Sequence, residues 1–405
     1  MSAQGFGFNY KATSADSYWW VRVYDSGLSV NLSNVPTVCV DTSNNIYAFI
    51  DSLQAVKFNN AGSIQFQNID QTSSYTSQAG YATSAGDSYQ TGAAGTTNTV
   101  ILDKRSSSGT LTWVRSLSSL RQNGGAITNS SSDVYVTTRT VSGSTTTGNQ
   151  IIKVAAAGTI SWQREINVSP LATPVRITLD SSENVFLCGN TVTGAGYLIK
   201  YNLSGTYQWY KVINVGLGKA VTDSSGNIYA IANGGTAVIK FDTTGAITWQ
   251  QTIKNSANTC TFNDICIDSS SNIYVCGTDN TSNIGVVAKL NSSGTAQWMT
   301  TINFTSASSG SVSPNSIAIN SLGSLIVSGQ YNPAALNLFI VKVPSTGTRT
   351  GTYGDLVYGT GSASLSTPSY TSTTGSLTST TSTYTIATPG NTLTTTTYTT
   401  ATTTI

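Results

Sequence analysis

The chain has 405 residues, of which only 9% are charged, and its formal net charge at pH 7 is +2. A nucleic-acid-binding protein needs a clustered basic face, whereas Lys104-Arg105 is the only adjacent basic pair in this sequence. Histidine, the most common general base and metal ligand, is absent. The composition therefore excludes a nucleic-acid partner, catalytic zinc and Ser-His chemistry.

The first 16 residues are interpreted as an N-terminal arm. Residues 1–8 contain no basic start followed by an apolar core, so we expect no secretory signal. No run in the chain approaches 18 apolar residues, so we expect no membrane insertion.

Seven copies of one pattern occupy residues 17–350. A copy has a short strand ending in Asp, a Ser-rich turn, an Asn-Ile-Tyr-like strand, a lysine-bearing strand, then Gly and usually Trp, as in Asp223-Ser-Ser-Gly-Asn-Ile-Tyr229. The lysines are 40 to 53 residues apart, about the length of a four-stranded blade; they are Lys57, Lys104, Lys153, Lys200, Lys240, Lys289 and Lys342. The period predicts an all-β fold, a seven-bladed β-propeller of four-stranded antiparallel blades. We expect the lysines to be solvated at strand ends.

The seventh copy lacks its final strand, because Gly351 stands where the other copies have Trp or Phe. The tripeptide Trp20-Val-Arg22 matches Trp113-Val-Arg115 of a later copy. We therefore predict that residues 17–26, with Trp20 and Arg22, add the outermost strand to the blade that contains Lys342. Such closure of the ring removes an exposed sheet edge.

The Asp-Ser-Ser turns are interpreted as hairpin connections. Their Asp, Asn and Ser side chains hydrogen-bond to nearby backbone in tight turns. A calcium site is the alternative, but the turns lack the carboxylate count and the distal Glu of a calcium loop. We predict no metal site and no cofactor.

The last segment, residues 351–405, has no charge after Asp355 and is rich in Thr and Ser. Stretches such as Leu393-Thr-Thr-Thr-Thr-Tyr-Thr-Thr400 favour β-strands. Three interpretations are open: a disordered stalk, extra strands on the propeller flank, or strands that complete a sheet with neighbouring subunits. We hypothesise an attachment or oligomerisation segment that pairs by strand addition with another copy or with another virion protein.

The repeated core resembles a bacterial and phage-type β-propeller repeat family built on Asp-Ser-Ser-Gly-Asn-Ile-Tyr. The resemblance covers residues 17–350 and is weakest in the second copy, where Gly86-Asp-Ser-Tyr89 replaces the core. It implies the propeller architecture and a place among secreted, surface or phage structural proteins. It carries over no catalytic residue, because propellers host many unrelated activities.

Carboxylates and thiols offer little chemistry in this sequence. Most Asp residues fall in the repeated turns, and Glu165 and Glu183 are the only glutamates. The five cysteines leave at least one unpaired, so we expect free thiols in the core, with a Cys266–Cys276 pair as the alternative. We predict that the chain has no catalytic residues and is not an enzyme. A propeller glycosidase or lyase would need a carboxylate or Tyr cluster in the central channel, which the sequence does not reveal.

Candidate recognition residues lie in the loops whose length varies between copies. Loops on a rigid scaffold commonly hold binding residues. Thr145 and Asn258 are candidates in two of these loops, and Tyr197 and Tyr331 are candidate stacking surfaces for a sugar. Simple solvated loops are the alternative.

Elimination then leaves two function classes. A low-charge, Ser/Thr/Asn-rich β surface without an export signal is typical of a virus particle, whose proteins fold in the host cytoplasm and work outside. We therefore predict a virion structural protein of a phage tail, fibre or capsid decoration, which presents the propeller for assembly or host-surface contact. The alternative is a glycan-binding adhesin or receptor-binding module, on a particle or on a cell surface.

Overall fold

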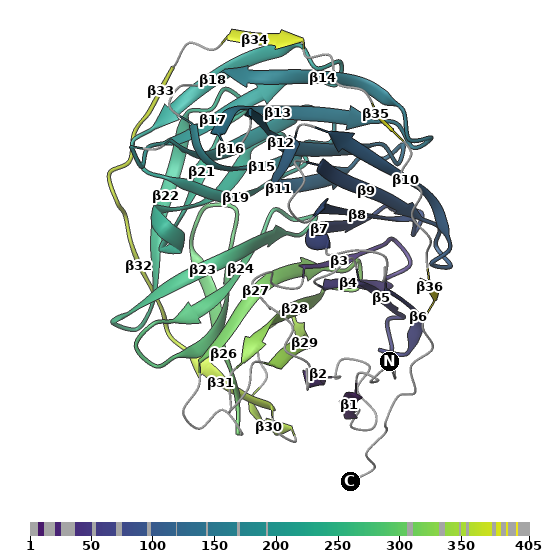
Figure 1. Cartoon of the computed structure of the whole chain (residues 1–405). Coiled ribbons are helices and arrows are strands. Elements are labelled where there is room, and N and C mark those ends of the chain that lie inside the picture. The colour runs from purple at the N-terminus through teal and green to yellow at the C-terminus, as the bar shows by residue number, and fades with distance from the viewer. Residues whose placement is uncertain are drawn as a thin grey trace.

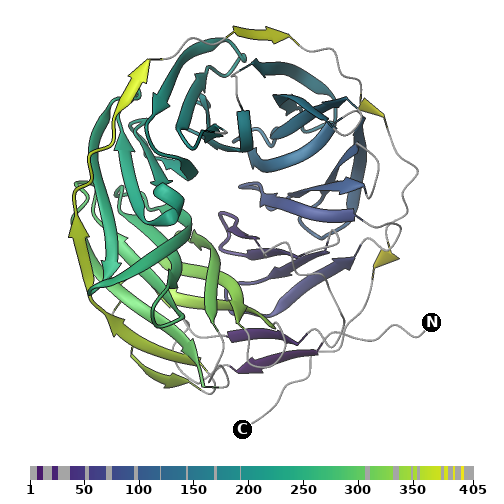
Figure 2. The same cartoon turned by 60° about the vertical axis from the view of Figure 1, so that its left-hand side comes forward.

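The computed structural model is a β-propeller, in which antiparallel sheets are arranged around a common centre (Figures 1 and 2). The structure describes residues 7–11, 21–25, 37–50, 54–69, 75–94, 99–118, 120–142, 145–167, 171–191, 193–305, 311–331, 337–347, 350–353, 356–374, 378–381, 386–387 and 394–395. Each copy of the repeat has one strand near the centre and successive strands further out.

Within these residues, hydrogen bonds join the strands into six sheets. Five of them have five strands each. In sheet order from the centre outward, they are β3 (Thr37–Val40), β4 (Ile46–Ile50), β5 (Gln54–Phe58), β6 (Ile64–Ile69), β36 (Thr394–Thr395); β7 (Tyr75–Ala82), β8 (Ser88–Ala94), β9 (Thr99–Arg105), β10 (Leu111–Ser118), β35 (Ile386–Ala387); β11 (Leu120–Thr128), β12 (Val134–Ser142), β13 (Thr145–Val154), β14 (Ile160–Asn167), β34 (Thr378–Thr381); β15 (Leu171–Leu179), β16 (Val185–Thr191), β17 (Gly196–Tyr201), β18 (Tyr207–Ile213), β33 (Ser372–Thr374); and β27 (Val312–Ile319), β28 (Ser324–Tyr331), β29 (Asn337–Pro344), β2 (Val21–Asp25), β1 (Gly7–Lys11).

The sixth sheet is a continuous curved sheet of eleven strands. It contains β19 (Leu217–Thr222), β20 (Ile228–Ala232), β21 (Ala237–Phe241), β22 (Ile247–Asn255), β23 (Asn258–Ile267), β24 (Ile273–Asp279), β25 (Ile284–Leu290), β26 (Ala296–Phe304), β30 (Gly351–Tyr353), β31 (Leu356–Gly361) and, paired with β22, β32 (Ala363–Ser366). A short 3-10 turn, η1 (Asn233–Gly235), connects β20 to β21.

The prediction of seven separate four-stranded blades is therefore wrong. Five blades are separate, and the fifth and sixth copies of the repeat share the eleven-stranded sheet. The reason is local: β22 runs directly into β23, and the two strands pair at Lys254↔Thr259 and Asn255↔Asn258. The separate blades also have five strands rather than four, because strands from the chain ends are added at the outer edges.

The repeated Asp-to-Tyr motif is a turn lock. One carboxylate oxygen of Asp223 accepts hydrogen bonds from the backbone N–H of Ser225 and Asn227, at 3.0 and 2.9 Å. The other accepts from the Asn227 side chain at 2.8 Å and from the Tyr229 hydroxyl at 3.0 Å. The same arrangement recurs around Asp268 and Asp41. The motif therefore stabilises hairpins, and this role accounts for its recurrence.

The expectation that the repeated lysines are solvated at strand ends is wrong for four of the seven, because Lys57, Lys104, Lys153 and Lys342 are buried, while the other three are half-buried. Lys342 is only 1% exposed and Lys57 only 7% exposed. Lys57 Nζ donates to the carbonyl oxygen of Ser107, in the next copy, at 2.9 Å, and it lies 5.0 Å from the centre of the Tyr47 ring. Lys342 Nζ donates to the carbonyl oxygen of Asn60 at 3.2 Å and so connects the last copy to the first. Lys57, Lys104, Lys240 and Lys342 therefore connect neighbouring copies by hydrogen bonds to backbone carbonyl groups.

The Gly and Trp of the repeat form a second contact between neighbouring copies. Trp249 Nε1 donates to the carbonyl oxygen of Ser292 at 3.0 Å, in the Ser-Ser-Gly turn of the following copy. In that turn, Gly294 has φ of +81°, and a Cβ at this position would come within 2.9 Å of the Trp249 ring. Only glycine tolerates both the backbone conformation and the close packing.

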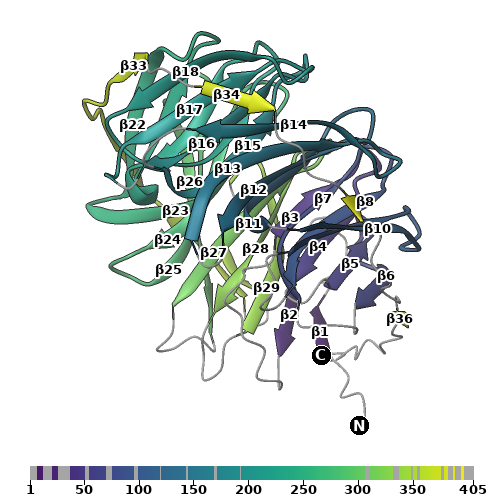
Figure 3. The same ribbon diagram turned by 45° about the horizontal axis from the view of Figure 1, so that its top comes forward.

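The C-terminal segment is a belt around the propeller. Its strands pair antiparallel with the outer strands of the sheets in reverse chain order: β31 with β26, β32 with β22, β33 with β18, β34 with β14, β35 with β10 and β36 with β6. Figure 3 shows β33, β34 and β36 on the outer rim. Of the three interpretations, extra strands on the flank describe these residues, which pair with their own chain. We call β31 to β36 the belt.

The N-terminal strand lies beside the last copy of the repeat. β2 pairs with β29, which contains Lys342, and Arg22 is opposite Ile340. β2 is not the outermost strand as predicted, because β1 pairs with its outer edge. Trp20 lies outside the described residues. The two chain ends together thus add the fifth strands of the blades.

Acid is expected to destabilise the fold through the Asp turns. Burial alone would raise the pKa of Asp223 and Asp268, but hydrogen bonds from Asn, Tyr and backbone groups outweigh it, and both pKa values are lowered. A lowered folded-state pKa gives stability that is present above the unfolded value, about 3.9, and is lost as the pH falls through the folded value. We expect a constant melting temperature from pH 7 to about pH 5 and a marked fall below about pH 4. A melting temperature at pH 3 equal to that at pH 7 would contradict this role.

Candidate functional site in the central channel

The candidate site is a cavity of about 160 Å³ at the centre of the ring, where the innermost strands β3, β7, β11, β15, β19, β23 and β27 meet. Six of its lining residues occupy one repeat position, four residues before the residue that begins the Asp-Ser-Ser-type turn. They are Thr37, Gly125, Arg176, Lys219, Asp264 and Ser316. The repeat therefore supplies a ring of equivalent positions, and three consecutive copies place charges there.

β-Bulges on the innermost strands lie beside these lining residues. The strand register shifts between Thr173 and Arg176, between Leu217 and Ala220, and between Phe262 and Asp264. β7, β11 and β27 have shifts at the corresponding places. A bulge re-aims a side chain and is common beside binding and active sites. Here the bulges interrupt the regular pairing beside the residues that line the cavity.

Asp264 is the buried anion of the site and is 6% exposed. Its Oδ1 accepts from the backbone N–H of Ile265 at 2.8 Å, and its Oδ2 accepts from that of Ile317 at 3.0 Å. Lys219 Nζ lies 2.8 Å from Oδ2, and the Lys219 side chain retains 28% of its exposure. Asp264 therefore joins β23 to β27 and holds the Lys219 ammonium at the cavity wall.

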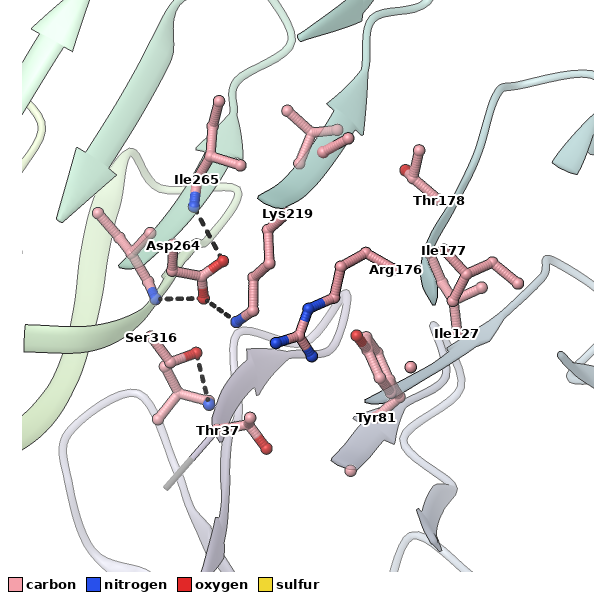
Figure 4. Close-up of a pocket in the computed structure, with 16 residues that line it drawn as sticks. Thr37, Tyr81, Ile127, Arg176, Ile177, Thr178, Lys219, Asp264, Ile265 and Ser316 are labelled. Atoms are coloured by element: carbon pink, nitrogen blue, oxygen red, sulfur yellow. Dashed lines mark hydrogen bonds and ion pairs between the residues drawn. The ribbon is translucent and has the colours of Figure 1, made fainter. Parts of the chain in front are cut away.

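Arg176 and Tyr81 complete the polar cluster. The side chains of Arg176, Lys219, Asp264 and Tyr81 point toward one another in Figure 4. Burial raises the pKa of Tyr81, the negative charge of Asp264 adds to the increase, and Arg176 opposes it. The Tyr81 phenol is therefore neutral and able to donate a hydrogen bond at neutral pH. Two cations and one carboxylate give the charged lining residues a net charge of +1.

The predicted stacking surfaces lie elsewhere and are covered. Tyr197 is 0% exposed within the core of the fourth copy. Tyr331 is 4% exposed, and its ring stacks on Phe304 with 4.2 Å between the ring centres. Neither ring has a face for a sugar, because alternation along a strand turns each of these side chains into the sheet packing.

The two predicted loop residues belong to strands. Asn258 begins β23, and its side-chain amide donates to Asp279 Oδ2 at 3.0 Å, which stabilises a hairpin end. Thr145 begins β13 and pairs with Ser142. The structure brings none of the four predicted residues into the channel cavity.

Metals and thiols contribute no further site within the described ranges. These residues contain no group of three or more Cys, Asp or Glu side chains placed to hold a metal ion. All five cysteines are free thiols; four are buried and Cys39 is half-buried. No helix in the described part of the chain has the length and apolar character needed to span a membrane.

Comparisons with known proteins give the fold alone. No family model matches the chain, and no curated protein matches it. Among solved structures, a streptogramin B lyase is 14% identical, with a TM-score of 0.52, and the match covers 80% of this chain and 99% of that one. A catalytically inactive virginiamycin B lyase from Staphylococcus aureus with quinupristin is 13% identical, with a TM-score of 0.52 and coverage of 79% and 99%. YCF48 bound to D1 peptide is 10% identical, with a TM-score of 0.50 and coverage of 82% and 99%.

The lyases correct the prediction that this chain is not an enzyme. They have the same fold, so the fold and the absence of a recognisable catalytic motif do not exclude enzymatic activity. In the inactive lyase a histidine is replaced by alanine. This chain contains no histidine. At these identities, the similarity identifies the chain as a β-propeller and assigns it no reaction.

Proposed function

We propose that this protein is a structural protein of a virus particle, in a tail, a fibre or a capsid decoration, which presents its propeller for assembly or host-surface contact. The observation that supports this proposal is the belt. The C-terminal segment of the chain covers the outer strands of the sheets with uncharged β-strands, which protects edges that would otherwise pair with other proteins. This protection needs no disulfide, as suits a protein that folds in a reducing cytoplasm and then works outside the cell.

The proposed partners are other virion proteins or further copies of this chain. They would contact the belt from outside, because its inner edge is already paired with the propeller. We also propose that the chain belongs to a phage-type repeat family. This proposal rests on the repeated Asp-Ser-Ser-Gly-Asn-Ile-Tyr core.

Mass spectrometry of purified particles from the source tests the virion location. We expect tryptic peptides such as residues 177–200, which end at Lys200, in a fixed ratio to a known particle protein. The ratio should stay constant through a second, independent purification step. Absence from particles, with recovery from cell-surface fractions, would contradict the virion location and favour a cell-surface adhesin.

A receptor-binding module is the second candidate function, and the central channel favours it. Arg176, Lys219, Asp264 and Tyr81 form a polar cluster in a cavity, as a ligand site does. The neighbour YCF48 was solved with a peptide bound, so a propeller of similar shape takes a ligand in that protein. A host-surface glycan is the partner that we propose for this module, on a particle or on a cell surface.

A further inference from the structure

We propose that the central channel binds the anionic oxygen group of a small ligand, through Arg176 and Lys219, with the Tyr81 hydroxyl as an additional donor. This inference rests on the second candidate function, the receptor-binding module, and adds the chemical class of its ligand. Its starting point is the charge balance: the cavity lining has two cations and one anion.

The carboxylate of Asp264 is not available to bind a cationic ligand. Its oxygens already accept from Ile265, Ile317 and Lys219. A buried carboxylate with three donors is satisfied, and its remaining effect on the cavity is to hold the Lys219 ammonium in place. The excess charge that a ligand meets is therefore positive.

The donor set suits an oxyanion. A guanidinium presents a planar fork of N–H groups that matches the two oxygens of a carboxylate or two oxygens of a phosphate, and such charge-assisted bonds are about twice as strong as neutral ones. Lys219 contributes a compact ammonium beside the fork. Tyr81 remains protonated because burial and Asp264 raise its pKa, so it donates rather than competes with an anion.

The size of the cavity limits the ligand. Its volume of about 160 Å³ is about five times the share of one water molecule in the liquid, and it is below the range of about 300–1,000 Å³ for drug-sized ligands. The channel therefore takes one acidic group with a small body, such as one sugar acid or one phosphate, rather than a long chain. The β-bulges beside Arg176, Lys219 and Asp264 are consistent with positions built to aim side chains at such a group.

Isothermal titration calorimetry on the full chain tests this site with three probes. Sodium glucuronate carries a carboxylate on a sugar ring, glucose is the matched neutral ring, and inorganic phosphate is the other source of an oxyanion. We expect glucuronate or phosphate to bind and glucose to bind at least tenfold more weakly. Binding of glucuronate would identify the anionic group as a sugar carboxylate, and binding of inorganic phosphate would identify it as a phosphate. Binding of neither, or equal binding of glucose, would overturn the proposal.

Variants separate the site from the fold. Arg176→Gln is expected to lower the affinity for the acidic probe at least tenfold, and Arg176→Lys should retain part of that affinity. Lys254→Gln removes the same charge from β22, outside the cavity, and should leave binding unchanged. Thermal unfolding checks that each variant is folded. Unchanged binding in a folded Arg176→Gln variant would overturn the assignment, whatever the particle analysis shows, because that analysis reports location and not ligand chemistry.

Discussion

Truncation after residue 354 is expected to lower the free energy of unfolding by about 4 kcal/mol and to make the protein associate. Leu356 and Tyr358 of β31 are 1% and 2% exposed, and both pack in the core that contains Phe304, Tyr331 and Phe339. Full burial of one large apolar side chain contributes about 1.5–3 kcal/mol, so the loss of two accounts for this value. The truncation also uncovers the outer edges of β26, β22, β18, β14, β10 and β6. Exposed edges pair with other chains.

Urea unfolding measures the first effect, and light scattering after size-exclusion chromatography measures the second. Truncation after residue 387 is the matched control, because among the described strands it removes only β36 (Thr394–Thr395). It should change the unfolding midpoint far less. A protein truncated after residue 354 that remained monomeric, with the midpoint of the full chain, would show that the belt is not part of the folded core. That outcome would instead favour the hypothesis that residues 351–405 attach the chain to a partner.

Replacing the turn carboxylate, as in Asp223→Ala, is expected to destabilise the fold by about 3 kcal/mol. Asp223 is 7% exposed and accepts four hydrogen bonds, from Ser225 N, Asn227 N, Asn227 Nδ2 and the Tyr229 hydroxyl. A hydrogen bond to a charged group contributes about 1.5–3 kcal/mol. Ser225 is exposed and Asn227 is half-buried, so their donors bond to water in the variant, and we expect a net loss of about one such bond together with the cost of the unpaired buried hydroxyl. The buried Tyr229 hydroxyl loses its partner in this variant.

Chemical denaturation of Asp223→Ala beside the wild-type chain measures this cost. Ser224→Ala changes the exposed neighbour in the same turn and should stay within about 0.5 kcal/mol of the wild-type value. Asp223→Asn keeps one oxygen acceptor and should fall between the two. Equal stability of Asp223→Ala and Ser224→Ala would contradict the turn lock.

The repeat spacing predicted a β-propeller, and that class of fold is confirmed. The number of separate blades was wrong, because the sequence period marks each copy but does not report whether two copies share hydrogen bonds. The contact between β22 and β23 is a pairing of only two residue pairs. Nothing in the composition of residues 254–259 distinguishes such a hairpin from an ordinary connection between blades.

The residues that line the channel were not predicted from the sequence, because they do not belong to the repeated motif. The positions that recur in every copy form the turn locks and the contacts between copies. The informative position is one that changes between copies, four residues before each turn, where Arg176, Lys219 and Asp264 stand in place of small residues such as Gly125 and Ser316. Residues that recur in every copy stabilise the copies themselves. This variable position lies on the innermost strand of each copy, so its charged residues meet at the centre of the ring.

The strand content and the Asp-Asn-Tyr turns were predictable from the amino-acid sequence, because the turn contacts join residues that are close in the chain. The repeat length was predictable because it is the spacing between equivalent residues of the copies. Three features became evident only in the tertiary structure: which copies share a sheet, the burial of lysines such as Lys57 and Lys342 against another copy, and the pairing of the uncharged C-terminal segment with its own chain. Each of these depends on residues far apart in the chain, such as Lys342 and Asn60. A local sequence pattern does not show which of these distant residues come into contact, because their contact depends on the closure of the ring.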